Sequence, residues 1–158
     1  MEDNQKSKEE KVGKYPVGFY FSVSLGDELN VDFQEVSGIS KELNVEDIVG
    51  GGENQYKYRL PTGSSSKNLV LKRALVLDTS SLLTWCVDSI DGGLSKPITT
   101  KDISVNLLDK NGIVSMKWVF YKAYPVKYSV SDLKSQQSEI LIESIELAYT
   151  YFTISPVS

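Results

Sequence analysis

The sequence contains no histidine, and its only cysteine is Cys86. Most zinc sites and most pairs of a nucleophile with its base are built from histidine and cysteine side chains. The usual zinc sites and most hydrolase arrangements are therefore excluded, and one cysteine cannot form an intrachain disulfide. We expect a fold held by burial of apolar side chains, and we predict no catalytic residue, no cofactor and no metal site.

Positive charge and long apolar runs are also scarce. Lysine and arginine number 17 against 21 acidic residues, so no net positive field attracts nucleic acid or anionic lipid. No uncharged apolar run is long enough to cross a bilayer, and the first 14 residues are polar and charged. We predict synthesis in the cytoplasm, no membrane insertion and no direct nucleic-acid specificity, although stacking of single-stranded nucleic acid on the nine tyrosines is a weaker alternative.

The length of 158 residues suits one domain with its own core. Residues 1–14 contain almost no apolar side chain, so they are predicted to form a flexible N-terminal tail. Ordering of this tail by a neighbouring subunit is the alternative. The domain itself is expected over residues 15–158.

Alternation of apolar and polar residues predicts a mainly β fold with two clear hairpins. Residues 17–25 and 29–33 alternate on either side of Gly26-Asp27, and residues 103–107 and 114–120 alternate on either side of a turn at 109–112. A calcium loop at this second turn is rejected because apolar residues stand where further ligands would be needed.

A third hairpin is predicted over residues 41–60, with three consecutive glycines at its tip. No Lys-Ser/Thr pair follows these glycines, which argues against a phosphate-binding loop. The polar run 61–67 is expected to be a loop. Residues 69–77 are expected to be a buried strand, with Lys72 and Arg73 at its exposed edge.

One helix is predicted over residues 79–91, because acceptable N-cap residues precede an apolar stripe and Gly92-Gly93 follows it. Cys86 lies on this stripe and is interpreted as a small buried hydrophobe. Pro125 is expected to end or kink the strand before it.

The last apolar segment, residues 139–154, has apolar side chains on both faces of a predicted strand. Glu143 and Glu146 are interpreted as solvated or interface charges. Because one small domain cannot cover both faces of such a strand, we expect part of the cover to come from another copy of the chain.

Several short motifs, taken in order, carry a family likeness. They are Phe33-Gln34-Glu35-Val36-Ser37-Gly38-Ile39, Gly51-Gly52-Glu53-Asn54-Gln55, Arg59-Leu60-Pro61, Asn68-Leu69-Val70-Leu71-Lys72-Arg73, Leu83-Thr84-Trp85-Cys86, Ala123-Tyr124-Pro125-Val126-Lys127-Tyr128, Ser131-Asp132-Leu133 and Ile142-Glu143-Ser144-Ile145-Glu146-Leu147-Ala148-Tyr149. Together they resemble the tail tube family found in contractile phage tails and extracellular contractile injection systems. The likeness covers the chain after its N-terminal tail.

The resemblance implies a tail-tube-type β-barrel or sandwich with one flanking α-helix and a long β-hairpin extension over residues 41–60. It implies homo-hexameric rings stacked into a tube, with a sheath protein, a baseplate or spike hub protein, a tube cap and protein cargo in the lumen as partners. The particle would stay in the cytoplasm until release, or be extracellular. Such a subunit performs no bond chemistry.

The extension and the last apolar segment supply the predicted subunit interface. Its residues are Val49, Gly50, Gly51, Gly52, Glu53, Asn54, Tyr56, Tyr58, Ile142, Tyr149 and Tyr151. A tube-initiator ring that joins the tube to the baseplate or spike is the alternative within the family. A monomeric ligand-binding β-barrel is a less favoured alternative, and an enzyme based on carboxylate, hydroxyl or lysine groups lacks any supporting constellation.

Overall fold

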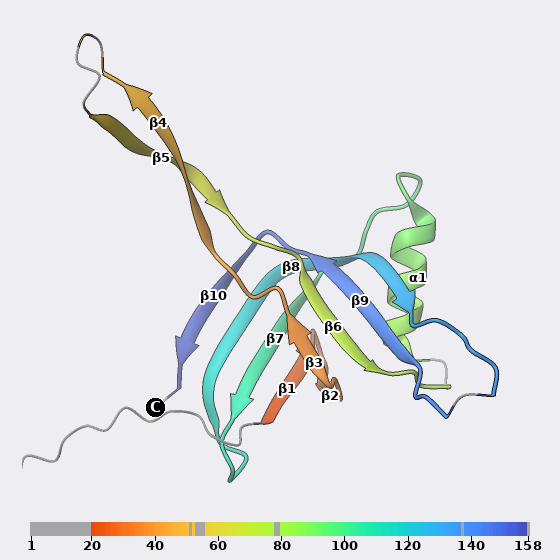
Figure 1. Cartoon of the computed structure of the whole chain (residues 1–158). Coiled ribbons are helices and arrows are strands. Elements are labelled where there is room, and N and C mark those ends of the chain that lie inside the picture. Colours follow the sequence, from red (N-terminus) through yellow and green to blue (C-terminus); the bar gives the residue numbers. More distant parts are fainter. Residues whose placement is uncertain (1–19, 51, 53–55, 78–79, 137, 158) are drawn as a thin grey trace, which may run out of the picture.

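The computed structural model describes residues 20–50, 52, 56–77, 80–136 and 138–157, and in them the chain forms ten strands and one helix (Figure 1). The predicted mainly β class is therefore confirmed. The predicted tail at 1–14 and the start of the predicted first strand, from Val17, lie outside the described residues.

One long strand, β8 (Val114–Val130), organises the sheet because its two halves pair with different strands. Its first half pairs with β7 (Lys101–Leu108) and β10 (Tyr151–Pro156), and its second half pairs with β9 (Ile142–Ala148). All pairings are antiparallel. The other strands extend the sheet from these partners: β1 (Tyr20–Leu25) and β2 (Glu28–Val31) beyond β7, and β6 (Leu69–Ala74) and β3 (Glu35–Ser37) beyond β9.

Two of the predicted hairpins are confirmed. β1 and β2 pair around Gly26, which has a φ of 58°, and β7 and β8 pair around the turn at Asp109. The Asp109 carboxylate accepts backbone N–H bonds from Asn111 at 2.8 Å and Ile113 at 2.9 Å. This side-chain acceptor stabilises the turn in the manner of an Asx turn.

The core lies between the two branches of the sheet and under the helix α1 (Ser81–Gly92). Its fully buried side chains come from both branches and from the helix: Val23, Leu25, Leu69, Leu71, Leu82, Cys86, Ile103, Phe120, Ala123, Ile145 and Leu147. Ser80 is the N-cap of α1, because its Oγ accepts the Leu83 N–H at 3.2 Å. The burial of Cys86 agrees with its interpretation as a core residue.

The last apolar segment is two strands, where the sequence predicted one. Tyr149 and Thr150 separate β9 from β10, and the Thr150 N–H donates to the Tyr121 carbonyl at 3.0 Å. The next residue of β8, Lys122, has a φ of 53°. The buried face shifts by one position on both strands at this corner, from Leu147 to Phe152 and from Phe120 to Ala123. The corner therefore turns the sheet over the core, so most of the core-directed apolar surface of this segment is covered by its own chain.

Two further predictions are corrected. Arg73 and Glu143 were expected at the surface, but they are 8% and 2% exposed and pair across β6 and β9 inside the core. Val76 and Leu77 were expected to be buried, but they follow the end of β6 and are exposed.

Pro61, which was expected in a loop, and Pro125, which was expected to end or kink a strand, both lie within strands. The predicted loop at 61–67 is largely strand, because β5 (Lys57–Ser65) continues through Pro61 to Ser65. A proline is tolerated there since β5 pairs only with β4 in the described chain, so one of its edges needs no N–H donor. β8 also continues past Pro125, with an irregular register between Pro125 and Lys127.

Candidate assembly surfaces

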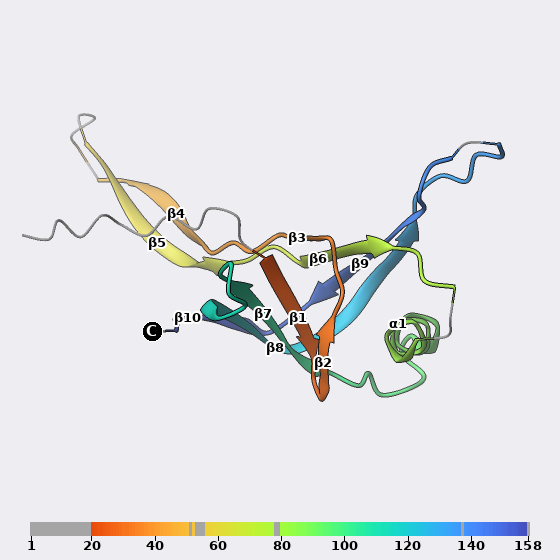
Figure 2. The ribbon, with the colours of Figure 1, turned by 90° about the horizontal axis from the view of Figure 1, so that it is seen from below.

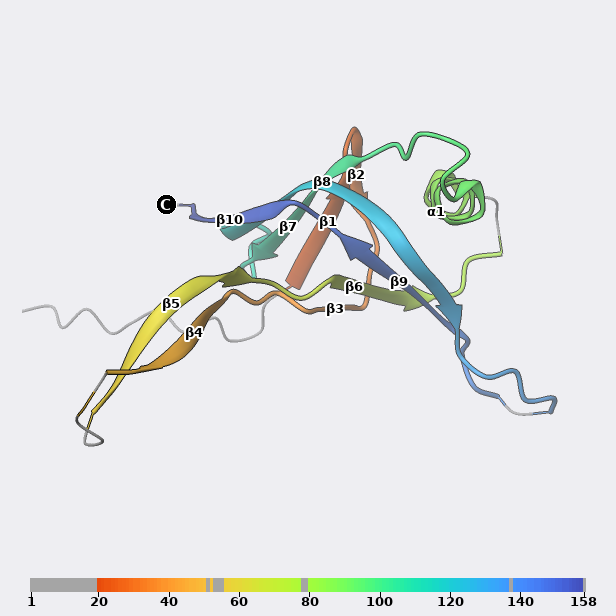
Figure 3. The same ribbon diagram turned by 90° about the horizontal axis from the view of Figure 1, so that it is seen from above.

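The hairpin formed by β4 (Glu42–Val49) and β5 projects away from the sheet, at the opposite end of the molecule from α1 (Figures 1, 2 and 3). Every residue of both strands is exposed. A two-stranded ribbon without a core is only marginally stable in water. Its conformation therefore needs support from its base or from a surface that covers it.

Both faces of this hairpin carry apolar side chains. On one face Ile48 lies opposite Tyr58 and Glu46 lies opposite Leu60. On the other face the cross-strand pairs are Val45 with Pro61, Asp47 with Arg59, and Val49 with Lys57. The Asp47 and Arg59 side chains form an ion pair at 3.4 Å that is open to water, so it contributes little to stability.

The base of the hairpin is held by an aromatic cluster of Phe120, Tyr149 and Phe152, with ring centroids 4.9 to 5.9 Å apart. On one side of the base, the Lys41 ammonium lies 4.5 Å from the centre of the Phe152 ring. On the other side, the Tyr149 hydroxyl donates a 2.7 Å hydrogen bond to the carbonyl of Lys67. One aromatic cluster therefore contacts both the segment that enters the hairpin and the segment that leaves it.

Replacing Tyr149 with phenylalanine tests this attachment. The change keeps the ring in the aromatic cluster but leaves the Lys67 carbonyl without its donor. We expect a loss of about 0.5–1.5 kcal/mol in the free energy of unfolding measured with urea. Tyr151→Phe is the matched control, because the exposed Tyr151 ring stacks on Tyr121 and no hydrogen bond of its hydroxyl is seen in the described chain.

The Ser37-Gly38 motif docks the chain on β6 just before the hairpin begins. Ser37 pairs with Val70, and Gly38 has a φ of 87°. A Cβ atom at Gly38 would lie 2.1 Å from the Asn68 carbonyl oxygen, which is far inside contact distance. Only glycine fits this crossing, so the motif has a structural reason that its sequence alone did not reveal.

The structure brings some of the predicted interface residues together and separates others. Val49, Gly50, Gly52, Tyr56 and Tyr58 lie at or near the outer end of the hairpin, and Gly51, Glu53 and Asn54 lie outside the described residues.

The other three lie on the body of the domain. Ile142 and Tyr149 are half-buried, whereas Tyr151 is exposed and stacks on Tyr121 with a centroid distance of 4.6 Å. The exposed apolar surface that needs cover is therefore centred on the hairpin more than on the last strands.

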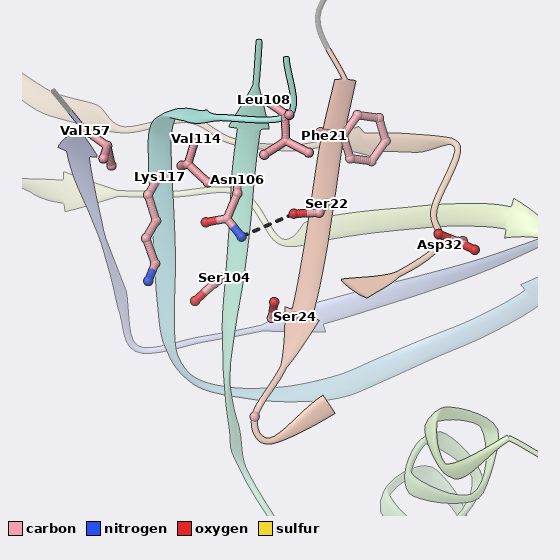
Figure 4. Close-up of a pocket in the computed structure, with 12 residues that line it drawn as sticks. Phe21, Ser22, Ser24, Asp32, Ser104, Asn106, Leu108, Val114, Lys117 and Val157 are labelled. Carbon is pink, nitrogen blue, oxygen red and sulfur yellow. Dashed lines mark hydrogen bonds between the residues drawn. The ribbon is translucent and has the colours of Figure 1, made fainter. Parts of the chain in front are cut away.

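A second surface is a shallow hollow of about 930 Å³ over the outer face of β1, β7 and β8 (Figure 4). The central positions of this face are small and polar: Ser22, Ser24, Ser104 and Asn106, with Lys117 beside them. The Asn106 amide lies 3.4 Å from the Ser22 hydroxyl, to which it donates. Phe21, Leu108, Val114 and Val157 border this polar centre, and Asp32 is the one carboxylate in the lining. No carboxylate pair or activated nucleophile converges here.

The buried pair of Arg73 and Glu143 is the feature that the sequence prediction missed. The Arg73 Nε donates to Glu143 Oε1, and the Tyr128 hydroxyl donates to Glu143 Oε2 at 3.0 Å. Arg73 Nη2 also reaches the Ser80 Oγ at 3.3 Å, which caps the helix. This network joins β6, β8, β9 and the start of α1.

These contacts indicate that the network of Arg73, Glu143, Tyr128 and Ser80 has a structural role. Burial, followed by the hydrogen bond to Glu143, raises the pKa of Tyr128, which is consistent with a hydroxyl that donates to a buried carboxylate. A signal was present in the sequence, because Arg73 is in phase with Leu69 and Leu71, and Glu143 is in phase with Ile145 and Leu147.

In the described part of the chain, neither a cluster of metal ligands nor a membrane-spanning helix is found. No group of three or more His, Cys, Asp or Glu residues there is close enough to hold a metal ion. None of its helices has the length and apolar character needed to cross a membrane.

The chain matches one known protein family and shares its fold with solved structures. The family model for the T4-like virus tail tube protein gp19 matches residues 17–153. A search of curated protein sequences gave no match.

Three solved structures share the fold. A chain of the PVC extracellular contractile injection system, in its extended sheath–tube complex, has a TM-score of 0.78 at 24% identity, and covers 92% of this chain and 95% of its own. A chain of the tube-terminating cap of the anti-feeding prophage has a TM-score of 0.80 at 21% identity, with 97% and 99% covered. A chain of the PVC sheath/tube terminator in the extended state has a TM-score of 0.77 at 25% identity, with 90% and 99% covered.

Proposed function

The chain belongs to the T4-like virus tail tube protein family, and we propose that it is the structural subunit of the inner tube of a contractile phage-tail-like injection system. The observation that carries this proposal beyond family membership is the hairpin, whose apolar side chains have no cover from their own chain. Other copies of the subunit supply that cover in a stacked tube.

The open edges of the sheet support ring formation. In the branch that contains β1 and β7, the described chain leaves one edge of β2 and one edge of β10 unpaired. Unpaired edges invite strand addition from another chain, and closure into a ring removes them. We infer that neighbouring subunits join through these edges in a homo-hexameric ring, and that rings stack.

The hollow over β1, β7 and β8, which has a polar centre, is the surface best suited to line the channel. A surface left in water in the assembly needs few large apolar side chains, and the centre of this face is hydroxyl- and amide-rich (Figure 4). Protein cargo would pass along such a wall without strong adhesion. The subunit itself then carries no catalytic role.

The proposed partners follow from the assemblies to which the similar structures belong. Those structures come from a sheath–tube complex, a tube-terminating cap and a sheath/tube terminator. We infer a sheath protein around the tube, a cap at one end and a baseplate or spike hub at the other, in a particle assembled in the cytoplasm. A tube-initiator ring remains the second candidate, because the same fold would serve it.

Introducing a charge on the hairpin tests the proposal. We expect Ile48→Asp to abolish tubes in negative-stain micrographs, because an apolar side chain that other copies cover becomes a buried, unpaired carboxylate. The subunit should stay folded, since Ile48 is exposed in its own chain.

Leu133→Asp is the matched control, because Leu133 is exposed and apolar but lies outside the hairpin. It should assemble like the natural chain. Long tubes of the natural protein would indicate the main tube subunit and isolated rings the initiator, whereas normal tubes from Ile48→Asp would contradict the proposed role of the hairpin.

A further inference from the structure

The turn between β7 and β8 contains a dipeptide, Asn111-Gly112, that has a chemistry of its own. Asn111 is the one asparagine in the sequence that a glycine follows, since every other asparagine precedes glutamine, valine or leucine. The side-chain amide of an asparagine can be attacked by the backbone nitrogen of the next residue. Glycine hinders this attack least because it has no side chain.

The structure leaves this dipeptide open to water. Asn111 and Gly112 are both exposed, and a Cβ atom at Gly112 would meet no atom within 4 Å. Within the described chain the Asn111 side-chain amide makes no hydrogen bond, whereas the amides of Asn68 and Asn106 each donate one to another side chain. The Asn111 amide is therefore the freest of these three to change its rotamer and meet the next backbone nitrogen.

The same turn restrains the attacking nitrogen. The Gly112 N–H donates to the Asp109 carbonyl at 2.9 Å, and the Asp109 carboxylate accepts the N–H groups of Asn111 and Ile113 at 2.8 and 2.9 Å. Gly112 completes the turn in a left-handed conformation, with a φ of 77°. Three hydrogen bonds to one residue thus hold the backbone around the reactive nitrogen, and attack requires the turn to open.

We propose that Asn111 is a site of spontaneous deamidation and that Asp109 sets its rate by holding the turn closed. In this reaction the Gly112 nitrogen gives its proton to hydroxide and bonds to the side-chain carbonyl carbon of Asn111. The bond from that carbon to the amide nitrogen breaks, and ammonia leaves with a proton from water. A second water molecule then opens the cyclic imide at either carbonyl, which leaves an aspartate or an isoaspartate at position 111.

The product changes the border of the hollow over β1, β7 and β8. Gly112 lines this hollow together with Leu108 and Val114, and Figure 1 shows the turn beyond the end of β7. The new carboxylate adds a negative charge to a chain whose formal net charge is already −4. An isoaspartate also lengthens the backbone of the turn by one carbon between two paired strands. This chemistry belongs to the folded subunit and does not depend on the tube function.

Peptide mass spectrometry of the aged full chain tests the proposal. The Ile48→Asp protein is used so that no neighbouring copy covers the turn. It is incubated at mildly alkaline pH, once folded and once in urea, and then cut after its lysines, which separates residues 111–117 from the preceding peptide with Asn106. We expect the 111–117 peptide to gain the mass of an amide replaced by an acid in both samples, and faster in urea. Asn106 should stay an amide in the folded chain.

Two substitutions of Asp109 separate the role of the turn from that of the dipeptide. Asp109→Ala removes the side-chain acceptor, so we expect the folded chain to convert about tenfold faster, since the loss of about 1.4 kcal/mol of hydrogen bonding corresponds to a factor of ten. Asp109→Asn is the matched control, because its amide oxygen still accepts the two N–H bonds and should keep the natural rate. Circular dichroism checks that both variants stay folded.

The outcomes address the two parts of the proposal separately. Conversion of Asp109→Ala at the natural rate, or of Asp109→Asn as fast as Asp109→Ala, would overturn the role of the Asp109 side chain. A 111–117 peptide that converts no faster than Asn106 in urea would overturn the modification site itself. Neither result would alter the proposed tube function, which is tested by the micrographs of Ile48→Asp.

Discussion

Glu143→Ala is expected to lower the free energy of unfolding of the subunit by about 3–5 kcal/mol, because it leaves Arg73 as an unpaired charge in the core. The Tyr128 hydroxyl loses its acceptor at the same time. A domain of this kind has about 5–15 kcal/mol in total, so the variant would lose a large part of its stability.

Urea unfolding in the non-assembling Ile48→Asp background measures this loss. Lys72→Ala is the control, because Lys72 and Glu35 form an ion pair at 3.2 Å that is open to water, and its loss should cost less than about 1 kcal/mol. The double variant Arg73→Leu/Glu143→Leu should recover much of the stability, since apolar pairs replace buried ion pairs well. A cost for Glu143→Ala no larger than that of Lys72→Ala would show that the core pair does not hold the helix and sheet together.

Gly38→Ala should have the second largest effect. The left-handed backbone costs an alanine about 1–2 kcal/mol, and the overlap of its Cβ with the Asn68 carbonyl adds about 1–3 kcal/mol through displaced backbone. Because Gly38 stands between β3 and the hairpin, the displacement should also change the direction of the hairpin and raise the protein concentration needed for assembly.

Gly63→Ala provides the comparison. Gly63 is exposed on β5, and a Cβ there would meet no atom within 4 Å. We expect its unfolding free energy to change by less than about 1 kcal/mol, with assembly retained. Equal effects of the two substitutions would rule out the close crossing at Gly38 as the reason for the glycine.

The hairpins and the helix could be predicted from the sequence because each is encoded locally. The two confirmed turns combine alternation with nearby turn residues, and Ser80 stands directly before the apolar stripe of α1. The projecting hairpin was also predicted as a pair of strands. Its length was underestimated, because Pro61 and the serines after it resemble a loop in composition while the ribbon pairs them with β4.

The features that were missed depend on residues far apart in the sequence. Arg73 and Glu143 are 70 positions apart, and each is a surface type of residue until the other lies opposite it. The corner at Lys122 and Thr150 is another such feature. Strand prediction assumes that every second side chain faces the core, so it does not detect a corner where the buried face shifts by one residue. The split into β9 and β10 followed from that shift.

The apolar pattern placed the exposed apolar surface on the last segment, where the fold instead covers Ile145, Leu147 and Phe152. The family resemblance also placed predicted interface residues on the hairpin. The hairpin carries the exposed apolar surface, since strands that extend beyond the core have apolar residues and no cover from their own chain. The need for other copies of the chain therefore rests on the hairpin.

Hydrogen–deuterium exchange of the hairpin tests most directly whether other copies of the chain cover it. We expect peptides covering residues 42–49 and 57–65 to exchange rapidly in the Ile48→Asp protein and slowly in assembled tubes, while peptides from β7 exchange slowly in both. Equal, rapid exchange of the hairpin peptides in tubes and in the unassembled protein would contradict the account.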